Sequence, residues 1–443
     1  MGPGRSFPDD FLFGCATSAY QVEGGITNDW SAWAEAGRLK DPSARNERAV
    51  EHWDRYLHDF DLLAGLGANA YRMSVEWARI EPEPGRYDDA ALAHYGRMFD
   101  ALLERGIEPM VTFFHFTHPP WFHATCPWHL PERGGPERFA AFVERSLEVV
   151  APRVRRYTIL NEPGVWLTGA YLAGAIPPGE KGLGRVAKAG ASLLLGHALA
   201  AAKIRKVRPD AELGIAHNVV AFAPESSSIL DRLAAGYVAR QFNHAVPRAF
   251  DSGVFQLGET PGLRYTEKVP GLVGTLDFLG INYYSRVYVG TRLRRPYGEL
   301  SYQDREGRGV TDLGWEIHPS GLTRILAEMA RYRRPIYVTE NGLDDRDDSR
   351  RAAFLHDHLA AVLDAREQGV DVRGYFHWSL LDNFEWLEGH LPRFGLFRVD
   401  PTTMERSPTQ GAEHYRRIIQ ARALPTERPP ATLKPGLGPV RVG

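Results

Sequence analysis

The chain has 443 residues, of which 43% are apolar and 24% are charged, as in a globular protein with a large buried core. Its formal net charge is −2 and it has no run of lysine and arginine, which excludes the electrostatic pattern of a nucleic-acid-binding protein. Because no stretch reaches about 18 uninterrupted apolar residues, we expect no membrane partner.

The cysteines and the amino-terminal residues indicate a compartment. Two cysteines, Cys15 and Cys126, cannot form a disulfide framework. The opening MGPGRSFPDDFLFG has no apolar segment of a secretory signal, and the chain has no N-x-S/T sequon. These features favour a cytoplasmic protein, whereas the oligomeric state is unknown at this stage.

Eight short apolar segments recur along the chain and predict parallel strands, because their apolar residues are continuous rather than alternating. They cover residues 11–17, 70–75, 109–115, 156–161, 213–218, 276–283, 335–340 and 373–378. Amphipathic helices are expected between them, as in 54–66 and 350–368. A doubly wound sheet would carry a glycine-rich phosphate turn, which is missing, so we predict an α/β fold, a single-domain (β/α)8 TIM barrel.

The segments that follow several strands are longer than a barrel needs, and active sites of this fold are built from such loops. The extended βα loops cover residues 20–50, 163–190, 285–318 and 379–406. We assign residues 1–423 to the catalytic barrel. Residues 424–443 are rich in proline and glycine and are expected to form a poorly ordered tail.

Polar and aromatic residues end the predicted strands, and two of them are carboxylates on the fourth and seventh strands. These strand-end residues are Arg72, His115, Asn161, Glu162, Asn282, Tyr283, Tyr284, Glu340, His377 and Trp378. Aromatic rings stack on the CH faces of sugars, amides bind hydroxyl groups, and paired acids cleave acetals. The pattern therefore predicts a site for cleaving sugars at one end of the barrel.

Eight motifs in order along the chain make the assignment more specific. They are FLFGCATSAYQVEG (11–24), YRMSVEWARIEP (71–82), TILNEP (158–163), GINYYS (280–285), GWEIHPSGL (314–322), VTENG (338–342), HWSLLDNFEW (377–386) and RFGLFRVD (393–400). Together they resemble the motifs of glycoside hydrolase family 1, the β-glucosidase family. The resemblance runs from about Phe7 to about Ile419.

The resemblance implies a retaining, exo-acting β-glycosidase that works through a covalent glycosyl-enzyme without a cofactor. Its catalytic residues would be Glu162 as general acid/base and Glu340 as nucleophile, with Arg72 and Tyr284 supporting Glu340. Asn282 would support Glu162, and Trp315 would line the side of the leaving group, the aglycone. The other residues expected to bind the substrate are Gln21, His115, Phe116, Asn161, Trp378, Glu385 and Trp386.

Three positions bear on the substrate. Members that act on 6-phosphoglycosides typically have serine in place of Glu385 and a nearby lysine; this chain has neither, so we expect an unphosphorylated β-O-glycoside. Glu162 is not replaced by glutamine, as it is in myrosinase-like members. Phe116 stands where the family usually has a tryptophan that donates to a sugar hydroxyl, which leaves the preferred sugar open.

The sequence leaves two alternative functions open, and one histidine-rich segment is a candidate metal site. A transglycosidase would use the same residues, and a noncatalytic sugar-binding barrel would be expected to lack a carboxylate. The segment 115–129 contains four histidines and Cys126, but its loose spacing and prolines argue against a metal. His356 and His358 lie two residues apart in a predicted helix and are expected on its solvated surface.

Overall fold

The structure is a computed structural model that describes residues 5–259, 264–292, 295–434 and 440–442. Eight parallel strands close into a barrel, in the order β1-β13-β12-β9-β5-β4-β3-β2. The strands are β1 (Leu12–Ala16), β2 (Ala70–Ser74), β3 (Glu108–Phe114), β4 (Arg156–Asn161), β5 (Glu212–Asn218), β9 (Phe278–Asn282), β12 (Ile336–Asn341) and β13 (Val372–Trp378). The predicted (β/α)8 barrel and all eight of its strands are confirmed.

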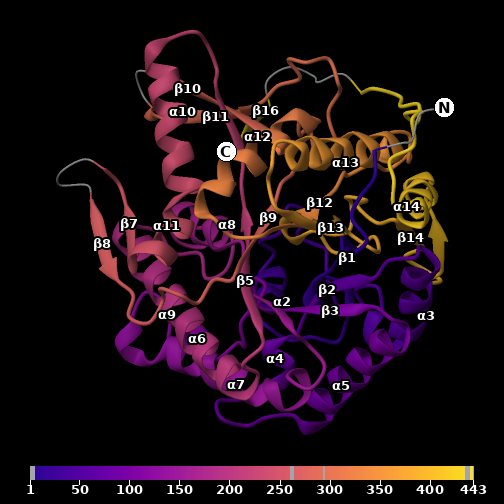
Figure 1. Ribbon diagram of the computed structural model, residues 1–443. Helices are drawn as coiled ribbons and strands as arrows, with labels where there is room; N and C mark the ends of the chain where they lie inside the picture. Colours follow the sequence, from indigo (N-terminus) through magenta and orange to yellow (C-terminus); the bar gives the residue numbers. More distant parts are fainter. Residues whose placement is uncertain (1–4, 260–263, 293–294, 435–439, 443) are drawn as a thin grey trace.

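Helices surround the barrel (Figure 1), with one long helix following each barrel strand. In chain order they are α3 (His52–Gly65), α5 (Asp89–Glu104), α7 (Gly135–Val150), α9 (Leu183–Val207), α11 (Ala245–Ser252), α12 (Pro319–Met329), α13 (Arg351–Glu367) and α14 (Gln410–Ala421). The apolar spacing of α13 explains its packing, since Leu355, Leu359 and Val362 are all fully buried. No helix in the described ranges is both long and apolar enough to cross a membrane.

Further elements lie outside the barrel strands and the helices already named, several of them in the expected loops 20–50, 163–190, 285–318 and 379–406. Short helices are α1 (Ala19–Val22), α2 (Asp29–Glu35), α4 (Trp77–Ile80), α6 (Phe122–Thr125) and α8 (Pro163–Leu167), and α10 (Ile229–Phe242) is longer. A second sheet has the order β16-β11-β10-β6, formed by β16 (Val440–Val442), β11 (Arg295–Tyr302), β10 (Arg286–Arg292) and β6 (Ala221–Pro224). Two-stranded ribbons pair β7 (Val254–Leu257) with β8 (Tyr265–Lys268), and β14 (Phe397–Val399) with β15 (Arg406–Pro408).

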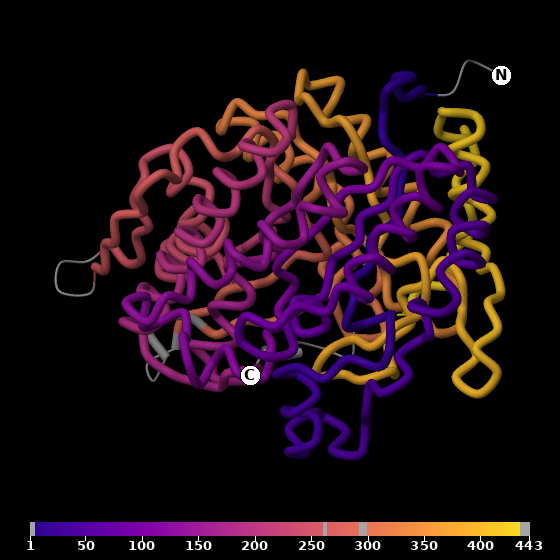
Figure 2. The backbone as a smooth tube through the Cα atoms, turned by 90° about the horizontal axis from the view of Figure 1, so that it is seen from below, coloured from indigo at the N-terminus to yellow at the C-terminus, as the bar shows by residue number. Residues whose placement is uncertain are grey.

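The loops that follow the strands extend the molecule at the carboxyl ends of the barrel strands. In Figure 2 the indigo segment that follows β1 projects from one side of the molecule. The strand β10 begins directly after Tyr284 and Ser285, which follow β9. This end of the barrel therefore carries most of the added structure, as expected for the side of a TIM barrel that holds the active site.

Two histidines differ from expectation, whereas the poor order expected of the carboxyl-terminal tail stays a prediction. Residues 424–434 contact the barrel, for example through an ion pair between Arg428 and Asp357 of 2.8 Å, whereas 435–439 and 443 lie outside the described residues. The boundary at residue 423 stays a prediction. The solvated position expected for His356 and His358 is wrong, because both are buried. His356 packs against His414 of α14 at 5.5 Å, and His358 stacks on Phe354 at 3.8 Å.

A buried ion pair joins α3, the first long helix, to Arg406 of β15. Asp59 of α3 accepts hydrogen bonds from Arg406 Nε at 2.8 Å and from His52 Nδ1 at 2.8 Å. The side chains of Asp59 and Arg406 are both fully buried. Each charge therefore depends on the other, because neither is compensated by water.

We expect Asp59→Asn to lower the free energy of unfolding by about 3–5 kcal/mol, because it leaves the Arg406 guanidinium buried without a counter-charge. Asp61→Asn on the same helix is the matched control. Asp61 forms an ion pair with Arg105, and its side chain is 64% exposed. Its replacement should therefore lower the free energy of unfolding by no more than about 1 kcal/mol. Urea unfolding followed by tryptophan fluorescence measures both. Equal losses would contradict the importance of the buried pair.

Candidate active site

The two predicted carboxylates lie at the carboxyl ends of strands on different sides of the barrel. Glu340 lies within β12, and Glu162 directly follows β4. Both side chains are buried, with 3% and 7% exposure. Two strands separate β4 from β12 in the barrel order, so the carboxyl groups approach the same end of the barrel from different directions.

Glu162 has a neutral environment. Its backbone is in the left-handed region, with φ of +43°, at the start of α8 where Pro163 follows. The carboxyl oxygen Oε1 accepts hydrogen bonds from Asn282 Nδ2 at 2.9 Å and from Asn218 Nδ2 at 3.1 Å. Burial, and then the nearby charge of Glu340, raise the pKa of Glu162 to about 8. Glu162 is therefore protonated at neutral pH.

Glu340 has a charged environment. Arg72 Nη1 donates to Glu340 Oε1 at 2.5 Å, and the Tyr284 hydroxyl donates to Oε2 at 2.7 Å. The guanidinium of Arg72 is fully buried and is held from below, where its Nε donates to the hydroxyls of Thr112 and Thr158 at 3.2 and 3.3 Å. A buried arginine and a hydroxyl donor stabilise the ionised form of the carboxylate that they contact.

Asn161 connects these groups to the predicted sugar pocket. Its Oδ1 accepts from Arg72 Nη2 at 2.6 Å and from Asn282 Nδ2 at 3.2 Å, and its Nδ2 lies 3.1 Å from His115 Nε2. Burial and the charge of Arg72 lower the pKa of His115 well below its usual value, so the imidazole is neutral. Its Nε2 then accepts from Asn161, which leaves the Nδ1 proton free to donate; within the described residues Nδ1 has no partner.

The opposite wall brings together Trp378, Glu385 and Gln21. Trp378 Nε1 donates to Glu385 Oε1 at 3.1 Å, and desolvation raises the pKa of Glu385 to about 8. Gln21 Nε2 donates to the carbonyl of Phe384 at 2.7 Å and to Asn383 Oδ1 at 2.9 Å. Both amide protons of Gln21 are therefore used within the protein. Its Oε1 already accepts from Ser18 Oγ at 2.7 Å, so one acceptor position of this oxygen remains.

Aromatic rings line the space between these walls. The ring centroid of His115 lies 5.9 Å from that of Trp378 and 6.1 Å from that of Trp386. Phe116 packs edge-on against Trp386 at 5.3 Å, and its backbone has φ of +71°, which is uncommon for a side-chain-bearing residue. Its carbonyl accepts from Trp30 Nε1 at 3.3 Å, so the strained conformation is fixed by α2.

Trp315 lies on the other side of Glu340. Its ring centroid is 5.7 Å from that of Tyr284 in an edge-to-face contact, and it also packs at 6.2 Å against Phe394. Trp315 and Tyr284 are both partly exposed, unlike Glu340 itself. The predicted site residues therefore lie around the two carboxylates. One group is on the side of Asn161 and His115, and the other is on the side of Trp315.

Sequence reasoning missed three residues of this site. Asn218 contacts Glu162 and ends a predicted strand, so the rule that polar strand ends build the site could have found it. Thr339 donates to Asn282 Oδ1 at 2.6 Å and orients that amide. Glu76 is fully enclosed and accepts from Thr117 Oγ1 at 3.0 Å, which anchors the turn after Phe116. Glu76 directly follows the predicted strand 70–75, so the same rule could have found it.

The histidines of the segment 115–129 do not all share one partner. His118 Nδ1 contacts Asp29 at 2.8 Å, while its Nε2 accepts from Trp128 Nε1 at 2.7 Å. His123 and His129 both approach the carboxylate of Glu180 instead. Over residues 5–259, 264–292, 295–434 and 440–442, no group of three or more histidine, cysteine, aspartate or glutamate side chains is arranged to hold a metal ion.

Comparison with known proteins gives whole-length matches. "Beta-glucosidase A" of Thermotoga maritima is 32% identical and covers 95% of this chain and 99% of its own. The solved "beta-glycosidase from Pyrococcus horikoshii" has a TM-score of 0.88 and 35% identity, over 95% of this chain and 96% of that one. A Thermotoga maritima beta-glucosidase in complex with glucoimidazole has a TM-score of 0.86 and 31% identity, over 95% and 100%.

These similarities extend along nearly the entire length of this chain and of each matched protein. The model of one enzyme family, described as glycosyl hydrolase family 1, matches residues 4–424 of this sequence. The resemblance deduced from the motifs is confirmed, and this chain belongs to glycosyl hydrolase family 1.

Proposed function

We propose that this glycoside hydrolase is a retaining, exo-acting enzyme of the β-glucosidase type that cleaves unphosphorylated β-O-glycosides. The observation that supports the proposal is the difference in environment between the two carboxyl groups at the end of the barrel, Glu162 and Glu340. Glu162 accepts from two neutral amides and is protonated at neutral pH, whereas Glu340 contacts a buried guanidinium. Retaining hydrolysis needs one carboxyl of each kind.

In the first step, Glu340 attacks the anomeric carbon while Glu162 gives its proton to the glycosidic oxygen. The bond to the leaving group breaks, and an ester forms between the sugar and Glu340. The hydrogen bonds from Arg72 and Tyr284 hold the attacking carboxylate in one orientation, so little motion is needed to reach the transition state.

In the second step, Glu162 acts as the base. Esterification removes the charge of Glu340, which is one of the two effects that raise the pKa of Glu162, so the proton leaves Glu162 more easily. A water molecule gives its proton to Glu162 and attacks the anomeric carbon, which frees the sugar and the Glu340 carboxylate. Two displacements return the original configuration.

We assign the sugar pocket to the groups on the side of Asn161. The free Nδ1 of His115, the acceptor capacity of Gln21 and the carboxyl of Glu385 are suited to sugar hydroxyls, and the Trp378 ring offers a stacking surface. The names of the similar β-glucosidases support a glucoside as substrate. We also propose a cytoplasmic location, which the two buried free thiols support.

The direct test is a set of initial rates on aryl β-glucoside, β-galactoside, β-fucoside and 6-phospho-β-glucoside. We expect turnover of the neutral glycosides and little of the phosphorylated one. An added alcohol distinguishes hydrolysis from transfer, since a transglycosidase would form an alkyl glycoside as its main product. No turnover of any neutral glycoside would favour a noncatalytic sugar-binding protein.

Replacing the proposed nucleophile should abolish turnover in a way that a small anion reverses. In Glu340→Ala, azide or formate can enter the vacated space and attack an activated β-glycoside in place of the carboxylate. The azide product should have the α configuration, because it forms by a single displacement. Nuclear magnetic resonance of the product identifies the anomer, and a β-glycosyl azide would contradict the role of Glu340.

Replacing the proposed acid/base should slow poor leaving groups most. We expect Glu162→Gln to lower kcat/KM for alkyl glycosides by about 10²–10⁴, the usual contribution of proton transfer. Dinitrophenyl glycosides need little protonation and should lose far less in their first step. Equal losses for good and poor leaving groups would indicate a structural role for Glu162.

The pH profile provides a separate test of the same residue. Because the pKa of Glu162 is raised to about 8, the acid form dominates below that pH, and kcat/KM should fall as pH rises through about 8. Glu385 also has a pKa of about 8, so the comparison needs Glu162→Gln with a dinitrophenyl glycoside. The alkaline fall should vanish in that variant, and its persistence would assign it to Glu385.

Phe116 should influence which sugar is preferred. If its ring lies against the sugar, Phe116→Trp would supply an indole donor and favour plain glucosides by about 0.5–1.5 kcal/mol, the worth of one neutral hydrogen bond. The 3-deoxyglucoside is the matched substrate, since it lacks a hydroxyl in that region. An unchanged ratio of kcat/KM for glucoside and 3-deoxyglucoside would make Phe116 a packing residue only.

A further inference from the structure

The C-terminal segment, defined here as residues 424–434, is fixed at several points against the loops beside the active site. Arg428 forms a paired contact with both carboxylate oxygens of Asp357 on α13, at 2.8 and 2.9 Å. Farther along, the backbone N–H of Thr432 donates to the carbonyl of Ser349 at 3.2 Å. Both partners belong to the region that follows Glu340 in the chain.

The end of this segment reaches the loop that precedes Trp315. The carbonyl of Lys434 accepts from the backbone N–H of Val310 at 2.9 Å, and Lys434 Nζ contacts Asp312 at 2.7 Å and Asp347 at 3.0 Å. Gly309 has φ of +83°, and a Cβ there would lie 3.0 Å from the Lys434 carbonyl oxygen. Glycine at this position thus permits the close approach of the two backbones.

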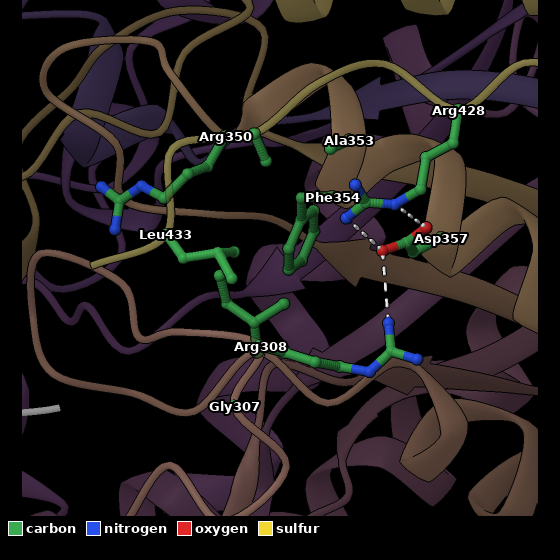
Figure 3. A pocket seen from close by; sticks show the side chains of 10 residues that line it. Gly307, Arg308, Arg350, Ala353, Phe354, Asp357, Arg428 and Leu433 are labelled. Atoms are coloured by element: carbon green, nitrogen blue, oxygen red, sulfur yellow. Dashed lines mark hydrogen bonds and ion pairs between the residues drawn. The ribbon is translucent and has the colours of Figure 1, made fainter. Parts of the chain in front are cut away.

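A cavity of about 150 Å³ lies beneath the segment. Figure 3 shows Arg428 and Arg308 both directed at Asp357, with Leu433 near Phe354. Arg308 comes from the loop, Asp357 and Phe354 from α13, and the other two from the C-terminal segment. The segment, the loop and the helix are therefore connected around this cavity by charged contacts and apolar lining rather than by continuous packing.

Asp312 links the C-terminal segment to the turn that carries Trp315. The turn between them is closed by the backbone N–H of Thr311, which donates to the Trp315 carbonyl at 2.8 Å, and by Trp315 N–H, which donates to Thr311 Oγ1 at 3.1 Å. Besides Lys434, the Asp312 carboxylate accepts from Arg350 at 2.9 Å. The position of this turn is thus set by contacts to Asp312, one of which comes from the C-terminal segment.

Trp315 in turn is next to the reacting groups. Its ring meets Tyr284 edge-to-face at 5.7 Å, and the Tyr284 hydroxyl contacts Glu340 at 2.7 Å. Because Trp315 is partly exposed at the outer side of this pair, its ring is available to a leaving group that extends out of the barrel.

We propose that the C-terminal segment is a specificity element, in which Lys434 positions the Trp315 turn through Asp312 and thereby strengthens recognition of the leaving group. This inference rests on the proposed glycosidase function. Lys434 is a positioning residue, not a catalytic one. A defect in it should appear only with substrates whose leaving group is large enough to touch Trp315.

The test compares two substrates with the same sugar. β-Glucosyl fluoride has a single-atom leaving group, whereas cellobiose has a whole sugar. Lys434→Glu places a carboxylate beside Asp312 and Asp347, so the segment should detach. We expect kcat/KM for cellobiose to fall about two- to tenfold, the scale of one misplaced aromatic contact, and that for glucosyl fluoride to stay within about twofold.

Lys203→Glu is the matched control, because Lys203 pairs with the exposed carboxylate of Glu144, as Lys434 does with that of Asp347. Lys203 is 40% exposed, against 37% for Lys434. Both kcat/KM values should be unchanged in it. A chain ending at residue 427 is the second variant and should lower the cellobiose to glucosyl fluoride ratio at least as far as Lys434→Glu. An unchanged ratio in Lys434→Glu, or equal losses on both substrates, would overturn the proposal. Failure of the unmodified enzyme to hydrolyse glucosyl fluoride would instead contradict the proposed function.

Discussion

The site depends on one buried positive charge, the guanidinium of Arg72. A fully buried arginine is tolerated only when its charge is compensated and its donors are bonded. Here Glu340 compensates the charge, and Asn161, the Thr339 carbonyl and two threonine hydroxyls accept further hydrogen bonds. The same contacts orient the proposed nucleophile and fix the amide that faces His115. The catalytic geometry is thus a consequence of compensating one charge inside the barrel.

The unequal surroundings of the two carboxyls follow from this placement. Arg72 reaches Glu340 directly but meets the Glu162 side only through the Asn161 and Asn282 amides, so Glu162 is left with burial and a neighbouring negative charge. Both effects favour its protonated form. The position of the arginine therefore gives two carboxyls of the same residue type the different environments that the proposed acid and the proposed nucleophile need.

The sequence predicted the barrel and the strand-end residues because both follow from regular periodicity. Continuous apolar segments marked the eight strands, and the residues that end them, such as Glu162 and Asn282, necessarily face one mouth. The role of Glu76 could not be found in this way, because its position after the predicted strand 70–75 does not show that it bonds Thr117 in the turn after Phe116. The contacts of Lys434 were also unpredictable, since a proline- and glycine-rich composition says nothing about which loop a segment will meet.

The two halves of the substrate site are consequently held by forces of different strength. The sugar half lies on barrel strands, where buried bonds such as that from Asn161 to Arg72 resist change. The half around Trp315 is held partly by surface ion pairs such as that of Lys434 with Asp347, each worth about 0–1 kcal/mol. Substitutions in these loops can therefore alter which leaving group is recognised while the chemistry stays intact, because the contacts that they break do not include Arg72, Glu162 or Glu340.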